Sequence, residues 1–201
     1  MPATKAAAAA SPKRRAAEII DAAAAVFAEK SYHGTTTQDI AARLGIRQAS
    51  LYYYVRSKED ALAQVCKLGV EGFLEFSEEI AGNGDSAAGR LAAIVRSHLA
   101  PIDVRPDYVK VFLTERQHLP KVRRKAISRT ARAYEGVIEG VIRDGIRSGE
   151  LAPATDPRLA TLALLGMCNE ATRWINTARG AGVEETARAF SRLLLDGLIR
   201  R

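Results

Sequence analysis

Residues 36–58, TTQDIAARLGIRQASLYYYVRSK, decide the fold of the N-terminal part of this 201-residue chain. Thr36 is suited to cap a helix, and Asp39 three residues later completes a capping box. Gly45 follows the apolar positions of that helix, where a left-handed residue commonly ends one. A second helix is expected over residues 48–54. Two short helices joined by a glycine-containing turn form a helix-turn-helix, whose second helix fits the DNA major groove.

The expected second helix has an unusual composition, because Tyr52, Tyr53 and Tyr54 are three of the six tyrosines in the chain. Three consecutive helical positions cannot all face one core. A tyrosine hydroxyl can donate to a phosphate oxygen, and the amide of Gln48 suits the adenine edge in the major groove. The alternative is that the tyrosines pack against neighbouring helices in a small helical domain.

Positive charge is concentrated beside this motif. Residues 1–58 contain nine lysines and arginines against four acidic residues, whereas the remaining 143 contain twenty-one against nineteen. Lys13, Arg14 and Arg15 stand at the expected start of the first helix, where the helix dipole disfavours cations. Bound phosphates would remove that conflict and release counterions. The alternative is a solvated charge run ahead of the domain.

Residues 15–65 resemble the DNA-binding domain of the TetR family of bacterial one-component repressors. The ordered motifs are a helix containing Phe27, the loop YHG at 32–34, a Thr-Thr cap, DIA, LGI, SLY and SKE. The resemblance implies that Gln48, Ala49 and Tyr52 face bases, while Ser50, Tyr53 and Tyr54 hold phosphates. It places Leu51 in the core. The family usually has a small polar cap where Arg47 stands, so Gln48 or water takes over the cap, or Arg47 contacts DNA directly. The candidate DNA-binding residues are Lys13, Arg14, Arg15, Thr36, Thr37, Gln38, Arg47, Gln48, Ala49, Ser50, Tyr52, Tyr53, Tyr54 and Lys58.

The rest of the chain also predicts helices, so the expected fold is all-α with about nine helices. The expected later helices cover residues 57–80, 86–101, 106–118, 121–148, 157–178 and from 183 onward. We expect a disordered arm at 1–12, the helix-turn-helix DNA-binding domain at 13–56, and a ligand-binding and dimerisation domain at 57–201.

The last two expected helices carry apolar residues on more than one face, including Leu159, Leu162, Leu193 and Leu194. A helix that is apolar beyond one stripe is usually buried on two sides. A monomer core is one explanation. A homodimer in which these helices form a four-helix interface is the other, and a palindromic operator in double-stranded DNA requires it.

Polar and aromatic residues on the apolar helices indicate a small-molecule site, since such sites are mainly apolar with a few convergent polar groups. The alternative is that Arg173 pairs with Glu170 or Glu115 and that Trp174 belongs to the core or interface. The candidate ligand-binding residues are His98, Tyr108, Phe112, Glu115, Arg116, Tyr134, Met167, Asn169, Arg173 and Trp174.

Four later segments resemble the C-terminal domain of TetR regulators of fatty-acid and steroid breakdown. They are FLTERQHLP (112–120), RDGIRSGEL (143–151), DPRLATLALLGMCNEATRW (156–174) and FSRLLLDGL (190–198). The resemblance implies a hydrophobic or acyl-CoA-like effector that releases a repressor from its operator.

Other classes of function are less well supported by the sequence. The single Glu-x-x-His at Glu115 and His118 lacks the second copy that a di-iron site needs, and no hydrolase or phosphate-loop motif is present. We therefore expect no enzyme activity and no cofactor. Two alternatives remain. One is a metal-responsive regulator with His98, Glu115 and His118 as the metal ligands, and the other is a constitutive architectural DNA-binding protein. Two cysteines without metal-type spacing and no apolar run of membrane length favour a cytoplasmic protein. The resemblance to the TetR family implies that it is bacterial.

Overall fold

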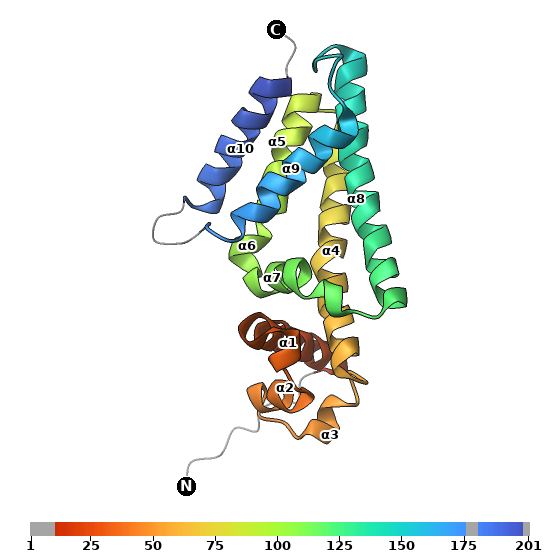
Figure 1. The fold of residues 1–201 in the computed structure, drawn as a ribbon, viewed down its shortest axis with the longest axis vertical. Coiled ribbons are helices and arrows are strands. Elements are labelled where there is room, and N and C mark those ends of the chain that lie inside the picture. The colour runs from red at the N-terminus through yellow and green to blue at the C-terminus, as the bar shows by residue number, and fades with distance from the viewer. Residues whose placement is uncertain (1–10, 176–180, 199–201) are drawn as a thin grey trace.

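The computed structural model describes residues 11–175 and 181–198. Within these ranges the chain is helical and contains no sheet, which confirms the predicted all-α fold (Figure 1). The helices are α1 (Pro12–Gly34), α2 (Thr37–Arg43), α3 (Gln48–Leu51), α4 (Lys58–Gly82), α5 (Ala87–Leu99), α6 (Pro101–Val104), α7 (Pro106–Thr114), α8 (Lys121–Ser148), α9 (Pro157–Ala171) and α10 (Val183–Leu198), with a 3-10 turn η1 (Arg116–His118) after α7.

The helix-turn-helix forms for the local reasons that the sequence indicates. The Thr36 side chain accepts from the Asp39 backbone N–H, and the Asp39 carboxylate accepts from the Thr36 N–H, so the capping box is complete. Gly45 adopts φ 62°, a left-handed conformation that turns the chain after α2. Ser57 caps α4 by accepting from the Asp60 N–H, and the Asp60 carboxylate accepts from the Arg56 N–H just before the helix.

Several predicted helix boundaries were wrong. α3 ends at Leu51 rather than 54, because the N–H of Tyr54 bonds the Leu51 carbonyl in a tighter turn. The helix expected to end at 101 breaks before Pro101, which has no N–H to donate. α7 ends at Thr114 rather than 118.

The helix expected to reach 178 also ends early. The Thr172 hydroxyl donates to the Asn169 carbonyl, and residues 172–175 continue in a turn that follows α9. The end of the prediction, 176–178, lies outside the described residues. Residues 1–10 of the arm expected at 1–12 also lie outside the described residues. The last two residues of that expected arm belong to the start of α1, where Ser11 caps the helix and Pro12 begins it.

Two hydrophobic cores stabilise the fold, one above the other in Figure 1. The lower core joins α1, α2, α3 and the first half of α4, and it includes Tyr108, Val111 and Phe112 from α7. The upper core joins α5, α8, α9 and α10. Because α7 also contributes Val109 to the upper core, it connects the two halves of the molecule.

Substitution of Gly145 on α8 tests how tightly the upper core is packed. A Cβ at this position would lie 2.6 Å from the Ala87 Cβ and 2.7 Å from the Leu151 Cγ. We predict that Gly145→Ala lowers the free energy of unfolding by about 1–3 kcal/mol, because a packed interior does not absorb an extra methyl group. Gly136 on the same helix is exposed and faces open space. Gly136→Ala should instead stabilise by up to about 1 kcal/mol. Urea denaturation of both variants measures the difference, and equal effects would contradict this packing.

No helix among the residues that the structure describes is long and apolar enough to cross a membrane. Cys66 and Cys168 are buried free thiols, and burial raises the pKa of each to about 12.

Candidate nucleic-acid interface and effector cavity

Three of the predicted DNA-binding residues form a polar cluster on the exposed side of α2 and α3. The Gln48 Nε2 donates to the Thr37 Oγ1 at 2.7 Å and lies 3.2 Å from the Tyr52 hydroxyl. The Thr37 and Tyr52 hydroxyls are 3.2 Å apart. The cluster stays accessible, since 48% of Tyr52 is exposed. Residues from both helices of the motif therefore present donors and acceptors at one place.

The neighbouring residues extend this face. Tyr53 is 82% exposed, and its ring meets that of Tyr54 edge to face with the centroids 5.0 Å apart. Leu51 is fully buried beneath them, as the resemblance implies. Arg47 precedes α3 without making a side-chain cap, so its guanidinium is not used to begin the helix. Four further candidates are exposed on this part of the molecule, namely Thr36, Gln38, Ala49 and Ser50.

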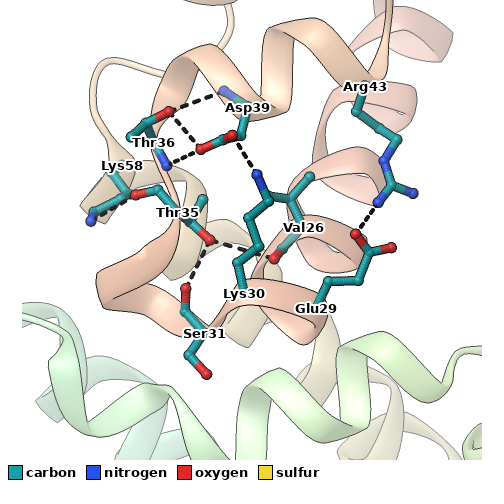
Figure 2. Close-up of polar contacts among 9 residues, drawn as sticks. All are labelled: Val26, Glu29, Lys30, Ser31, Thr35, Thr36, Asp39, Arg43 and Lys58. Carbon is teal, nitrogen blue, oxygen red and sulfur yellow. Dashed lines mark hydrogen bonds and ion pairs between the residues drawn. The ribbon is translucent and has the colours of Figure 1, made fainter.

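Contacts between α1 and α2 hold the motif in place (Figure 2). The Lys30 Nζ lies 2.5 Å from the Asp39 Oδ1 and, together with Thr36, holds the pKa of Asp39 well below its usual range. Arg43 forms an ion pair with Glu29 on α1. Because charges of both helices are paired in this way, the orientation of α2 follows that of α1.

Lys58 has a structural role in this structure. Its Nζ donates to the Tyr32 and Thr35 carbonyls at 2.9 Å each and lies 4.3 Å from the centre of the Tyr32 ring. A cation at the C-terminal end of α1 is favoured by the helix dipole. The DNA contact for which Lys58 is a candidate would therefore compete with these bonds.

The basic run at the start of α1 is partly neutralised. Arg14 and Arg15 both pair with Glu18, at 3.1 and 3.0 Å. Lys13 is exposed and forms no ion pair within the described ranges. These exposed pairs contribute little to stability and leave the cations free to exchange partners with phosphates.

A cavity of about 480 Å³ lies between α4, α5, α6 and α7. Its walls are mainly apolar, and Arg105 is its one lining cation among the described residues. Glycines at 69 and 72 leave room along α4. The cavity is lined by Leu68, Gly69, Gly72, Phe73, Phe76, Ser97, Ala100, Pro101, Val104, Arg105, Tyr108 and Val109. Its volume and composition are typical of a small-molecule site.

Of the ten residues predicted to bind a ligand, the structure brings only Tyr108 to this cavity. The buried His98 and Tyr134 and the half-buried Asn169 form a network beside Phe73, whose ring stacks on His98 with the centroids 4.8 Å apart. The His98 Nδ1 lies 2.9 Å from the Tyr134 hydroxyl and its Nε2 lies 3.2 Å from the Asn169 Oδ1. Because an amide oxygen only accepts, Nε2 carries the proton and Tyr134 donates to Nδ1. Burial lowers the pKa of His98 to about 4, so the ring is neutral at pH 7.

The other predicted ligand-binding residues lie in three further places. Phe112, Glu115 and Arg116 are at the junction with α1, where the Glu115 Oε2 accepts from the Tyr32 N–H at 2.8 Å. Arg116 lies over the Phe112 ring at 4.7 Å.

Arg173 and Trp174 follow α9 at the surface. The Arg173 Nε lies 3.5 Å from the Glu170 Oε1, one of the pairings expected as an alternative, and Trp174 meets Phe190 of α10 edge to face. Met167 is half-buried beside the upper core.

Sequence reasoning missed most of the cavity lining. Gly69 and Gly72 were a usable signal, since two glycines three residues apart inside a long helix leave one face open. Phe76 also lines the cavity and is a large apolar residue left exposed there, which only the structure reveals. No group of three or more candidate metal-binding side chains comes together in the described part of the chain.

A helix-turn-helix with an exposed polar face, joined to a larger helical unit that contains an apolar cavity, defines the class of DNA-binding regulators that respond to small molecules. Residues 19–65 match the family described as bacterial regulatory proteins, tetR family. Residues 84–198 match the tetracyclin repressor-like C-terminal domain. The chain therefore belongs to the TetR family of transcriptional regulators, which is not a family of enzymes.

Relatives of known function resemble the chain over most of its length. The fatty acid metabolism regulator protein of Bacillus subtilis is 28% identical over 181 residues, covering 90% of this chain and 93% of the relative. The repressor KstR2 of Rhodococcus jostii is also 28% identical, covering 90% and 89%. The structure of FadR from Bacillus subtilis in complex with stearoyl-CoA has a TM-score of 0.76 and 27% identity, covering 90% of this chain and 98% of that one. These relatives confirm the resemblance to regulators of fatty-acid and steroid metabolism.

Proposed function

We propose that this protein is a transcriptional repressor that binds a palindromic operator as a homodimer and leaves it when a hydrophobic or acyl-CoA-like effector binds. The observation that carries the proposal is the exposed cluster of Gln48, Thr37 and Tyr52 on the helix-turn-helix. Its donors and acceptors suit base edges. As predicted from the resemblance, Ala49 would also face bases, while Ser50, Tyr53, Tyr54 and Lys58 would hold phosphates.

We propose that the two parts of the chain have separate functions. Residues 13–56 would bind DNA, and residues 57–201 would bind the effector and form the dimer. Exposed leucines support a dimer through α9 and α10: Leu159 is 65% and Leu193 66% exposed. Apolar residues outside the buried stripe of a helix usually mean that the helix is buried on a second side.

The effector would occupy the cavity between α4 and α7. Its apolar walls suit an acyl chain, and Arg105 supplies one positive charge for an anionic group. The FadR relative was solved with stearoyl-CoA, which makes that thioester the first compound to test. We also propose that the protein acts in the bacterial cytoplasm, without a cofactor or enzymatic activity.

Two substitutions separate base reading from phosphate anchoring. Tyr53→Ala should weaken binding to operator and random DNA alike by about tenfold, since a hydrogen bond to a charged group contributes about 1.5 kcal/mol. Gln48→Ala should cost about 1–3 kcal/mol of discrimination at one base pair and relax the preference there. Fluorescence anisotropy with a set of single-base operator variants at fixed salt measures both effects.

Ser50→Ala removes another predicted phosphate contact from the same face and should therefore weaken binding to operator and random DNA alike, as Tyr53→Ala does. If Gln48→Ala and Tyr53→Ala lower affinity equally on every sequence, the assignment of Gln48 to base reading is wrong.

A further inference from the structure

Tyr108 belongs both to the cavity wall and to the contact with the DNA-binding part of the chain. Its ring lines the cavity, and its hydroxyl donates to the Asp21 Oδ1 on α1 at 2.6 Å. Burial and the Asp21 carboxylate raise the pKa of Tyr108, so the hydroxyl keeps its proton and remains a donor. None of the other described lining residues has a hydrogen bond to α1.

A second bond ties the far end of the same region to α1. The buried Glu115 carboxylate, which directly follows α7, accepts from the Tyr32 N–H at 2.8 Å. This N–H comes directly after Ser31, where φ 59° interrupts the helical course of α1. α7 is therefore bonded to α1 near Asp21 and again near its end, and Figure 1 shows it directly above α1.

The α1 helix is in turn bonded to the recognition motif. Lys30 and Glu29 pair with Asp39 and Arg43 of α2 (Figure 2). A displacement of α7 would thus reach α2 through a short series of charge-assisted bonds, which are stronger than neutral ones.

The cavity has empty space beside Gly72. A Cβ at Gly72 would meet no atom within 4 Å, whereas one at Gly69 would lie 3.5 Å from the Tyr108 carbonyl oxygen and from the Phe112 Cβ. A molecule in the cavity would contact α7 directly, because Tyr108 and Val109 of that helix line it. An occupant shifts the DNA-binding equilibrium only if its contacts differ between the two arrangements, and α7 supplies such contacts.

We propose that Tyr108 is the residue that couples cavity occupancy to the DNA-binding domain, through its bond to Asp21. The inference rests on the proposed function and deepens it by naming the point of transmission. Tyr108 acts as a positioning residue for α1.

A double-mutant cycle tests the coupling without requiring the natural effector. Gly72→Phe places a ring in the empty part of the cavity. An operator is first selected from randomised DNA by the full-length wild-type protein, and its affinity is then measured for wild type, Gly72→Phe, Tyr108→Phe and the double variant. Filling should lower affinity by about tenfold in the wild-type background and by less than about twofold in the Tyr108→Phe background. Stearoyl-CoA added to the two unfilled proteins provides a second measurement, with the same contrast expected.

Matched variants distinguish loss of the hydrogen bond between Tyr108 and Asp21 from a general loss of stability. Asp21→Ala should reproduce the loss of coupling, whereas Asp21→Asn should restore it, because the amide oxygen still accepts the Tyr108 proton. Tyr134→Phe removes another buried tyrosine hydroxyl, one that contacts His98 and not α1, and should retain the tenfold response. Thermal unfolding confirms that each variant is folded.

The outcomes are distinguishable. If the wild-type protein selects no DNA, the proposed function fails. If it does select DNA, two results would overturn the role of Tyr108. One is that Gly72→Phe weakens operator binding equally in the wild-type and Tyr108→Phe proteins. The other is that neither Gly72→Phe nor stearoyl-CoA changes the operator affinity of a protein with Tyr108 intact.

Discussion

Leu51→Ala should abolish operator binding while leaving the C-terminal helices folded. Leu51 is fully buried and ends a recognition helix of only four residues. A helix this short has no stability of its own, so its position depends on packing. Truncating a buried leucine costs about 2–5 kcal/mol, a large part of the stability of one small domain.

Chemical denaturation monitored by circular dichroism, together with anisotropy on operator DNA, measures this effect. Ser50→Ala, an exposed change on the same helix, should alter the free energy of unfolding by less than about 0.5 kcal/mol. A Leu51→Ala protein with wild-type stability and DNA affinity would contradict the role of Leu51 in holding α3.

Acid should destabilise the protein through His98. Burial lowers the pKa of this residue from 6.5 to about 4 in the folded protein. As the pH falls below 6.5, His98 therefore binds a proton in the unfolded chain, whereas its buried ring stays neutral in the folded protein. The contribution of His98 to the free energy of unfolding is therefore fully present above pH 6.5. It decreases by roughly 3 kcal/mol as the pH falls to about 4.

Urea denaturation between pH 7.5 and 4 checks this prediction, with His98→Gln as the comparison. Glutamine keeps polar atoms near Tyr134 and Asn169 but does not titrate. The difference in stability between the two proteins should change with pH across this window, which separates His98 from the carboxylates. Parallel curves would show that His98 is already protonated, or accessible, in the folded state.

The DNA-binding end of the fold was predictable because its signals are local. Thr36, Asp39 and Gly45 each act within four residues, and the structure forms the cap and the turn at those positions. The end of α3 was predicted wrongly because propensity does not distinguish a helix from the tighter turn that Tyr52 to Tyr54 adopt.

The cavity was much less predictable, since its walls come from four helices and only tertiary packing decides which faces meet. His98, Tyr134 and Asn169 are polar residues on apolar helices, which is also the pattern of a ligand site. They instead satisfy one another inside the core. Tyr108 was found, but its bond to Asp21 spans 87 positions and leaves no trace in local sequence.

The most direct test of the proposed repressor is the affinity of the wild-type protein for its selected operator and for a scrambled duplex at the same salt, each with and without stearoyl-CoA. A regulator of this kind should prefer the operator by about a thousandfold or more, and the effector should lower that preference. Equal affinity for both duplexes, unchanged by stearoyl-CoA, would contradict the account and indicate a constitutive architectural DNA-binding protein.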